Sequence, residues 1–459
     1  MTKISAKKAM LERLKSNRGS RGVGTACGVA VAAVGLALTP LWTRLSVFIY
    51  DWYNHLWFVG YFGEYFRSNL RMPDVVNVRD TVLFVSPVFY GFFFFPALGL
   101  ISALTGPALA FRILVAVLFI FQFYSCRRLV LALSRDEFLS NAVAVLVTWS
   151  VYPLTNLYHR AAFPELISTM LAVINCCYFL LLILEFSQRT SRRDVLWFVL
   201  TLILAAGSHP ITAFYYGLFL LGCAIAFGPQ TAAAVKRAGP GRILLVFLPV
   251  GLCLAPWIAA IGLMGRHLFY ASALKGVTLY PDIDTIAQRF SLLLPWADPR
   301  VELLGLARVD TPFLDTQVNM PLLLLIFFLG LATSSKNNGT EPGGRYWWAY
   351  GVGIGAFVAA TLLSLPLGLF ACLPKVFSIV EFAYRIVTYQ NLALLLILAV
   401  LLSYRKFDFS KKSFRAGVWA VPALSLASLA IKLVHVEKVR DIGCEDKLEY
   451  AHKIRPDPG

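Results

Sequence analysis

Long apolar runs recur along almost the whole chain, and they constrain its fold more than any other feature of the sequence. Many are close to the ~20 residues that an α-helix needs to cross a bilayer. The runs lie at 23–43, 82–104, 107–126, 139–154, 164–186, 195–209, 210–227, 243–264, 319–334, 346–372, 386–404 and 416–434. Apolar residues make up 58% of the chain and charged residues only 15%, whereas soluble domains have about 25% charged residues. This excludes a set of water-soluble domains and predicts an all-α integral membrane protein.

The basic residues predict how the chain is oriented. Lys and Arg number 42 against 25 Asp and Glu. In a membrane protein this excess is typical of cytoplasmic loops near anionic lipids, so we expect membrane lipids and no nucleic acid as partners. Residues 1–22 are predicted to form a basic cytoplasmic tail. If every apolar run crossed the membrane, the later basic clusters would lie outside, against the positive-inside bias. These clusters are Arg127/Arg128/Arg135, Arg189/Arg192/Arg193, Lys236/Arg237/Arg242 and Arg405/Lys406/Lys411/Lys412/Arg415.

One run must therefore fail to cross, and the run at 82–104 is the best candidate. It contains Pro87, Gly91, Pro96 and Gly99, and proline removes a backbone donor that a helix in lipid needs. We predict that 82–104 is a re-entrant or interfacial helical segment. About eleven transmembrane helices then remain, and every basic cluster returns to the cytoplasm.

The predicted architecture is one polytopic domain at 23–434, followed by a polar C-terminal tail at 435–459. Polar residues outside the membrane gather mainly in a first exterior loop at 44–81 and a long exterior loop at 265–318. The cytoplasmic loops are short, so no nucleotide-binding domain fits there. Any chemistry is therefore expected at the exterior face, where nucleotide sugars and ATP are absent.

The first exterior loop contains an acid and a histidine four residues apart, Asp51 and His55. On a helix this spacing places both side chains on one face, and the aromatic residues around them are typical of a helix in the headgroup layer. One interpretation is that Asp51 acts as a general base on an acceptor hydroxyl, while His55 orients Asp51 or contacts phosphate. The alternative is an interfacial helix whose polar face only meets water.

A second candidate is the exterior turn that contains His159, Arg160 and Glu165. His159 and Arg160 could bind a phosphate or pyrophosphate, for which the arginine fork is suited. Alternatively, Arg160 and Glu165 could form a structural ion pair at a helix start, where a carboxylate is favoured. The sequence leaves both interpretations open.

Two further candidates at the exterior face are His209, in a turn between spans, and Arg385, at the mouth of a late span. His209 is either a structural residue whose side chain is satisfied within the turn, or part of a functional site. Arg112 and Lys432 lie inside apolar runs, where a charge at mid-membrane costs about 2.5–3.5 kcal/mol and usually has a partner or a function. Snorkelling to the interface is the expected explanation for Lys432. The cysteines lack metal-type spacing, so they predict no metal site.

A cytoplasmic basic start, one span and then an exterior acid on an interfacial helix resemble the GT-C class of membrane glycosyltransferases. More narrowly, they resemble the bacterial integral-membrane family labelled "6-pyruvoyl-tetrahydropterin synthase-related", although nothing in the sequence suggests pterin chemistry. In that family an acid is followed four residues later by His, which matches Asp51 and His55. A Gly/Pro/Phe-rich interfacial stretch comes next and matches Ser86 to Pro96.

The remaining matches follow in chain order. An Arg before a Glu that opens a span matches Arg160 and Glu165, and a later exterior His matches His209. An aromatic residue and an Arg before a late span match Tyr384 and Arg385.

The resemblance implies a GT-C-like enzyme of the bacterial inner membrane, with a cytoplasmic N-terminus and a periplasmic active site. It implies a polyprenyl-phosphate sugar as donor, a lipid or glycan as acceptor, and inversion of the anomeric centre by direct displacement. By that resemblance Asp51 is the base, and the donor-binding group is drawn from His159, Arg160, Glu165, His209 and Arg385. No cofactor is required with certainty, and a divalent cation stays open. The alternatives are a transporter or flippase of a lipid-linked sugar and a structural subunit of a membrane complex.

Overall fold

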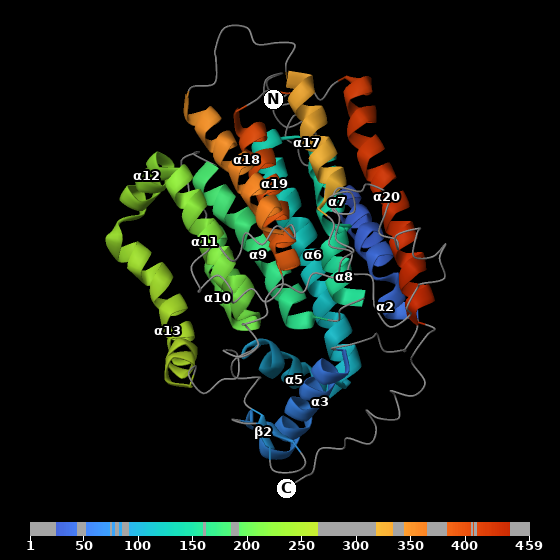
Figure 1. The fold of residues 1–459 in the computed structure, drawn as a ribbon, viewed down its shortest axis with the longest axis vertical. Helices are drawn as coiled ribbons and strands as arrows, with labels where there is room; N and C mark the ends of the chain where they lie inside the picture. Colours follow the sequence, from blue (N-terminus) through green and yellow to red (C-terminus); the bar gives the residue numbers. More distant parts are fainter. Residues whose placement is uncertain are drawn as a thin grey trace, which may run out of the picture.

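The computed structural model describes residues 24–43, 52–73, 76–78, 82–84, 91–158, 162–184, 192–264, 318–333, 344–364, 383–404, 407 and 411–440. Over these residues the chain is helical, as predicted, apart from one short hairpin of two strands. Most of the helices run side by side along the long axis of the molecule and form one bundle (Figure 1).

The bundle is centred on α9 (Phe163–Leu184), which packs against α6, α8, α10, α11 and α19. In α9, 89% of the most apolar window is buried, against 41% in α20 at the periphery. The other bundle helices are α6 (Pro107–Ser134), α7 (Glu137–Thr148), α8 (Val151–Tyr158), α10 (Arg192–Ser208), α11 (Pro210–Ala226), α17 (Met320–Thr333), α18 (Gly344–Ser364), α19 (Val387–Tyr404) and α20 (Lys412–Arg440). At one edge lie α12 (Gly228–Ala238) and α13 (Pro240–Met264), and α13 packs on α10.

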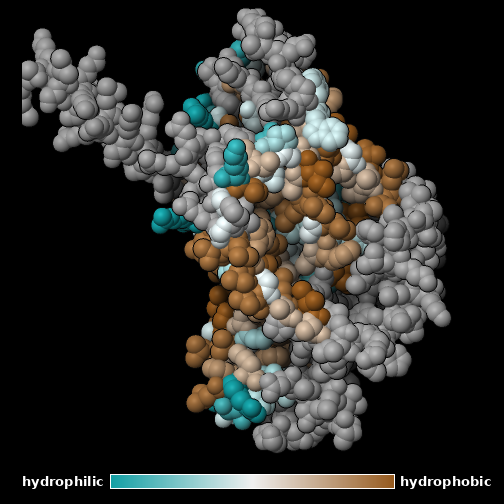
Figure 2. Space-filling model, turned by 90° about the vertical axis from the view of Figure 1, so that its left-hand side faces the viewer, coloured by the Kyte–Doolittle hydropathy of each residue, from teal (hydrophilic) through white to brown (hydrophobic). Residues whose placement is uncertain are grey.

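The length and composition of the helices fit a membrane-embedded protein. Within the described ranges, four helical segments are long and apolar enough to cross a membrane, namely Pro107–Ser134, Glu137–Tyr158, Phe163–Leu184 and Lys412–Val434. Shorter apolar helices lie at Gly24–Ala37, Phe94–Thr105, Ile211–Ala226, Met320–Ala332, Trp347–Leu363 and Val387–Ser403. Figure 2 shows hydrophobic residues over the middle of one face and hydrophilic residues toward its two ends. This distribution is expected for a bundle that is surrounded by lipid.

One end of the bundle carries two helices that lie across it, α3 (Trp52–Asn69) and α5 (Phe94–Thr105) (Figure 1). They pack tightly against each other, and α5 also packs on α6. Glycine permits this approach, since a Cβ at Gly99 would lie 2.6 Å from Cβ of Phe62. The helix α3 falls inside the predicted exterior loop at 44–81, where an interfacial helix was expected.

The segment 82–104, which was predicted not to cross the membrane, is only partly helical. It begins with strand β2 (Val82–Phe84), which pairs antiparallel with β1 (Val76–Val78). Farther along, Gly91 adopts a left-handed φ of 82° before α5 begins. At 1.5 Å per residue, the 12 residues of α5 span about 18 Å, well short of the ~30 Å hydrocarbon core. This helix is as short as α7 and only slightly shorter than α17, and the prediction that 82–104 does not span the membrane stays a prediction.

The predicted run 139–154 is not one continuous helix, because α7 ends at Thr148 and α8 begins at Val151. Pro153 gives the physical reason. Its ring would clash with the carbonyl of residue 149 in a continuous helix, whereas proline is tolerated in the first turn of a new helix.

Both ends of the predicted domain differ in detail from the structure. The first run contains a helix at Gly24–Ala37 and the short α2 (Thr39–Thr43). At the other end α20 continues to Arg440, so the tail that was predicted to start at 435 starts later. Residues 1–23 and most of the long loop at 265–318 lie outside the described residues.

Candidate functional site

The structure joins two of the predicted site residues in a buried ion pair. Nε of Arg385 lies 3.1 Å from Oε2 of Glu165. The side chain of Glu165 is 2% exposed and that of Arg385 is 11% exposed. Removing two charges from water is costly, and a buried pair persists only where hydrogen bonds satisfy its remaining atoms.

Those hydrogen bonds come from α8. The hydroxyl of Tyr152 donates to Oε1 of Glu165 at 2.6 Å, and Nδ2 of Asn156 donates to the same oxygen at 3.4 Å. Tyr152 and Asn156 are four residues apart, so they project from one face of α8. Glu165 itself lies in the first turn of α9, where the helix dipole favours a carboxylate. Arg385 is positioned by a short 3-10 helix, η5 (Ala383–Ile386), directly before α19.

The ion pair that the structure contains at the start of α9 joins Glu165 to Arg385, whereas the ion pair that the sequence predicts is between Arg160 and Glu165. Arg160 and His159 lie outside the described residues, so their predicted phosphate role stays a prediction. The same applies to Asp51, the predicted base.

His209 caps the start of α11 and is completely buried. Its Nδ1 accepts a hydrogen bond from the backbone N–H of Thr212 at 3.2 Å and lies 2.7 Å from Oγ1 of the same residue. The hydroxyl of Tyr389 donates to the carbonyl of Thr212 at 2.9 Å. Tyr389 is one helical turn after Arg385. The cap at His209 is thereby connected to the element that carries Arg385.

His55 is buried on α3 in an aromatic environment. Its ring centroid lies 5.8 Å from that of Phe95 on α5 and 5.5 Å from that of Phe163 at the start of α9. Neither ring nitrogen has a hydrogen-bond partner among the described residues. Burial disfavours the charged imidazolium and lowers the pKa of His55 to about 3, so the ring is neutral at pH 7. This burial is inconsistent with a polar face that only meets water.

Two hydrogen bonds to backbone carbonyls of α10 hold these elements at one end of the bundle. The N–H of Phe93, just before α5, donates to the carbonyl of Gly207 at the end of α10. The hydroxyl of Ser168 on α9 donates to the carbonyl of Ala205 on α10 at 2.8 Å. Figure 1 shows the same arrangement, with α3 and α5 beneath the ends of α9 and α10. Four of the predicted site residues, His55, Glu165, His209 and Arg385, therefore belong to elements that meet at this end.

One buried charge in this region differs from its prediction. Lys432 does not snorkel to the interface, because it is fully buried and its Nζ donates to Oγ1 of Thr155 on α8 at 3.0 Å. Thr155 lies next to Asn156, so α8 contacts both Lys432 and Glu165. Each of these α8 residues is a single uncharged polar side chain inside an apolar run. No periodicity in the sequence distinguishes such residues from helix packing.

A small cavity lies at the break between α7 and α8, and Tyr152, which hydrogen-bonds to Glu165, is one of its lining residues. Its volume is about 30 Å³, and Tyr152 lines it together with Gln122, Ser150 and Thr169. Oε1 of Gln122, Oγ of Ser150 and Oγ1 of Thr169 are buried without a hydrogen-bond partner among the described residues. The cavity is large enough for one or two water molecules. In the part of the chain that the structure describes, no three His, Cys, Asp or Glu side chains gather as a metal site.

Comparison with known proteins finds no family model, no curated protein and no solved structure that matches this chain.

Proposed function

We propose that this protein is a membrane glycosyltransferase that moves a sugar from a polyprenyl-phosphate donor to an acceptor at the end of the bundle that carries α3 and α5. The observation that supports this proposal is the ion pair between Glu165 and Arg385. It joins residues far apart in the chain at the end where His55 and His209 also lie. Interfacial helices beside a buried arginine suit a lipid phosphate at headgroup depth.

The proposed reaction is a direct displacement at the anomeric carbon. Asp51 removes the proton from an acceptor hydroxyl, and the acceptor oxygen forms the new bond to the anomeric carbon. The bond from this carbon to the phosphate oxygen breaks, and the lipid phosphate leaves with the electron pair. Arg385, together with His159, Arg160 and His209, stabilises the charge that develops on the leaving phosphate. Glu165 positions Arg385 through the ion pair.

The finer features of the proposal follow the charge pattern and the resemblance. We propose about eleven spans in a GT-C-like arrangement. We also propose that the N-terminus lies in the cytoplasm of a bacterial cell and that the α3 and α5 end faces the periplasm.

The test is release of polyprenyl phosphate from a panel of polyprenyl-phosphate hexoses and pentoses by membranes that contain the protein and its endogenous acceptor. We expect release by the natural protein and at least a 100-fold loss in Asp51→Asn, because general-base catalysis contributes about 10²–10⁴-fold. Arg385→Lys keeps the positive charge but loses the paired N–H donors of the guanidinium. It should therefore weaken donor binding, whereas Asp51→Asn should leave donor binding unchanged. Full activity of Asp51→Asn would contradict the base assignment.

A transporter or flippase of a lipid-linked sugar is the second candidate, and the break between α7 and α8 favours it. Broken helices and buried charges such as Lys432 are typical of transporter binding sites. Proteoliposomes loaded with a fluorescent polyprenyl-phosphate sugar separate the two candidates. Movement of the intact lipid between leaflets without cleavage would favour the transporter, and cleavage without movement would favour the enzyme.

A further inference from the structure

A second pocket lies at the opposite end of α6 from the candidate site. It has a volume of about 640 Å³ and is formed between α6, α9 and α10. Its lining residues are Phe121, Tyr124, Arg127, Arg128, Leu131, Ala132, Tyr178, Arg193 and Trp197. We propose that this pocket binds the phosphate headgroup of an anionic membrane phospholipid.

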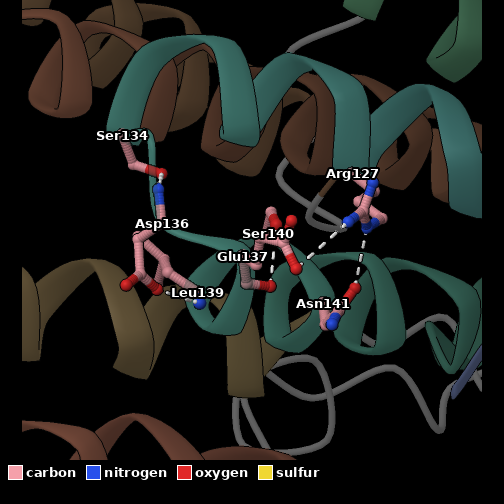
Figure 3. A network of polar contacts seen from close by, with 7 residues as sticks. All are labelled: Arg127, Ser134, Asp136, Glu137, Leu139, Ser140 and Asn141. Carbon is pink, nitrogen blue, oxygen red and sulfur yellow. Dashed lines mark hydrogen bonds and ion pairs between the residues drawn. The ribbon is translucent and has the colours of Figure 1, made fainter. Parts of the chain in front are cut away.

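The three arginines differ in how they are held. Arg127 reaches from α6 to α7, where its Nε donates to Oδ1 of Asn141 at 2.9 Å and its guanidinium lies 3.9 Å from Glu137 (Figure 3). Arg128 pairs with Asp194 on α10 at 2.7 Å. Arg193 is exposed, and none of the described residues hydrogen-bonds or ion-pairs with it.

The charge balance follows from these contacts. Arg127 and Arg128 each face one carboxylate, whereas Arg193 adds a positive charge that no described acid offsets. The pocket is therefore suited to a ligand with a single negative charge, such as the phosphodiester of a phospholipid. Arginine is the side chain best matched to phosphate.

The aromatic side chains lie deeper along the helices than the arginines. On α6, Phe121 precedes Arg128 by about two helical turns, or roughly 10 Å. On α10, Trp197 follows Arg193 by about one helical turn. The rings of Phe121 and Trp197 are 4.8 Å apart, and Tyr178 of α9 lies 6.3 Å from Phe121. A molecule in this pocket would meet charge at the end of the bundle and apolar rings toward its middle, which is the order of groups in a phospholipid.

Exposed apolar side chains continue from the pocket toward the middle of the bundle. On α6 these are Val117 and Ile120, which are 54% and 42% exposed, and on α10 Leu200 is 39% exposed. They offer a surface for acyl chains directly below the headgroup position. A free phosphate ion would use the arginines and leave this surface unused, so the arrangement favours a lipid. The arginines also belong to the end predicted to face the cytoplasm, where anionic lipids are enriched.

The test uses the full-length protein in a neutral detergent, with binding of dioleoyl phosphatidylglycerol measured by native mass spectrometry. Phosphatidylcholine, glycerol phosphate and inorganic phosphate are the comparison ligands. We expect phosphatidylglycerol to bind best and Arg193→Gln to weaken that binding about fivefold, since one arginine near an anionic lipid contributes about that factor. Arg192→Gln is the matched control, because Arg192 is the exposed neighbour that does not line the pocket.

Other outcomes would overturn the proposal. Equal losses in Arg192→Gln and Arg193→Gln would mean nonspecific surface attraction, and equally tight binding of inorganic phosphate would mean a free-anion site. A second readout is quenching of tryptophan fluorescence by phosphatidylglycerol with brominated acyl chains. Trp197→Phe should remove part of this quenching, and unchanged quenching would place the acyl chains elsewhere.

Discussion

At the scale of single residues, the candidate site depends on a buried pair of opposite charges. Neither side chain could stay charged at this depth without the other. Glu165 and Arg385 are both largely removed from water, and the hydroxyl of Tyr152 satisfies one carboxylate oxygen. Removing one member of a buried pair leaves an uncompensated charge, which costs more than the pair itself contributes. The two residues should therefore behave as one unit in stability measurements.

This coupling can be measured with a double-mutant cycle. We expect Glu165→Gln and Arg385→Met each to lower the free energy of unfolding by about 3–5 kcal/mol. The double variant should be more stable than the sum of the two losses predicts, because it leaves no unpaired charge. Chemical unfolding in detergent measures all four proteins. Losses that simply add would mean that the two side chains do not interact.

His55 predicts a specific dependence of stability on pH. Its pKa is about 3 in the folded protein and about 6.5 in an unfolded chain. Below pH 6.5 the unfolded state therefore binds a proton that the folded state does not, and stability falls as the pH drops toward 3. The expected loss between pH 6.5 and pH 5 is about 2 kcal/mol.

The measurement is the midpoint of thermal unfolding from pH 5 to pH 7 in His55→Phe and in the natural protein. Phenylalanine fits the aromatic contacts to Phe95 and Phe163 but does not titrate. The natural protein should lose stability over this range by the His55 contribution, and His55→Phe should lose less. The same slope in both proteins would show that His55 is not the titrating group.

At the scale of elements, the sequence predicted the helices better than it predicted their interruptions and contacts. Apolar runs identify α6, α9 and α10 because lipid and core both demand a continuous apolar helix. The break before α8 depends on a single residue, Pro153, within such a run. The pairing of Glu165 with Arg385 depends on how distant helices pack, which no local pattern encodes. The same holds for Lys432, whose partner Thr155 lies on another helix.

The contact between α10 and the segment before α5 makes a prediction about one glycine. A Cβ at Gly207 would collide with the ring of Phe93, whose N–H donates to the carbonyl of Gly207. Gly207→Ala should therefore lower the free energy of unfolding by about 1–3 kcal/mol, because the ring or the backbone must move. Gly222→Ala is the control, since a Cβ there meets no atom within 4 Å.

In that control, alanine in a helix should be neutral or stabilising by up to about 1 kcal/mol. Chemical unfolding of both variants in the same detergent tests the pair. A Gly207→Ala protein as stable as Gly222→Ala would show that Phe93 does not pack on α10 in solution.

At the scale of the whole molecule, the two ends of the bundle have different chemistry. One end carries α3, α5 and the Glu165–Arg385 pair, and the other carries the arginine-lined pocket between α6 and α10. Helix lengths and composition establish that such a bundle suits a membrane. The positive-inside bias predicts that the arginine-rich end faces the cytoplasm.

Two exposed residues offer a matched test of this orientation. Leu70 follows α3 and Arg135 follows α6, and both have a left-handed backbone, with φ of 53° and 58°. We expect Leu70→Cys to react with an impermeant maleimide added to intact cells and Arg135→Cys to react only after the membrane is opened. The background protein should have serine at the exposed Cys27 and Cys253 and at Cys372 and Cys444. Labelling of Arg135→Cys but not Leu70→Cys in intact cells would show that the orientation in the membrane is the reverse of the predicted one. The α3 and α5 end would then face the cytoplasm, where nucleotide sugars are present, and the case for a lipid-linked donor would fail with it.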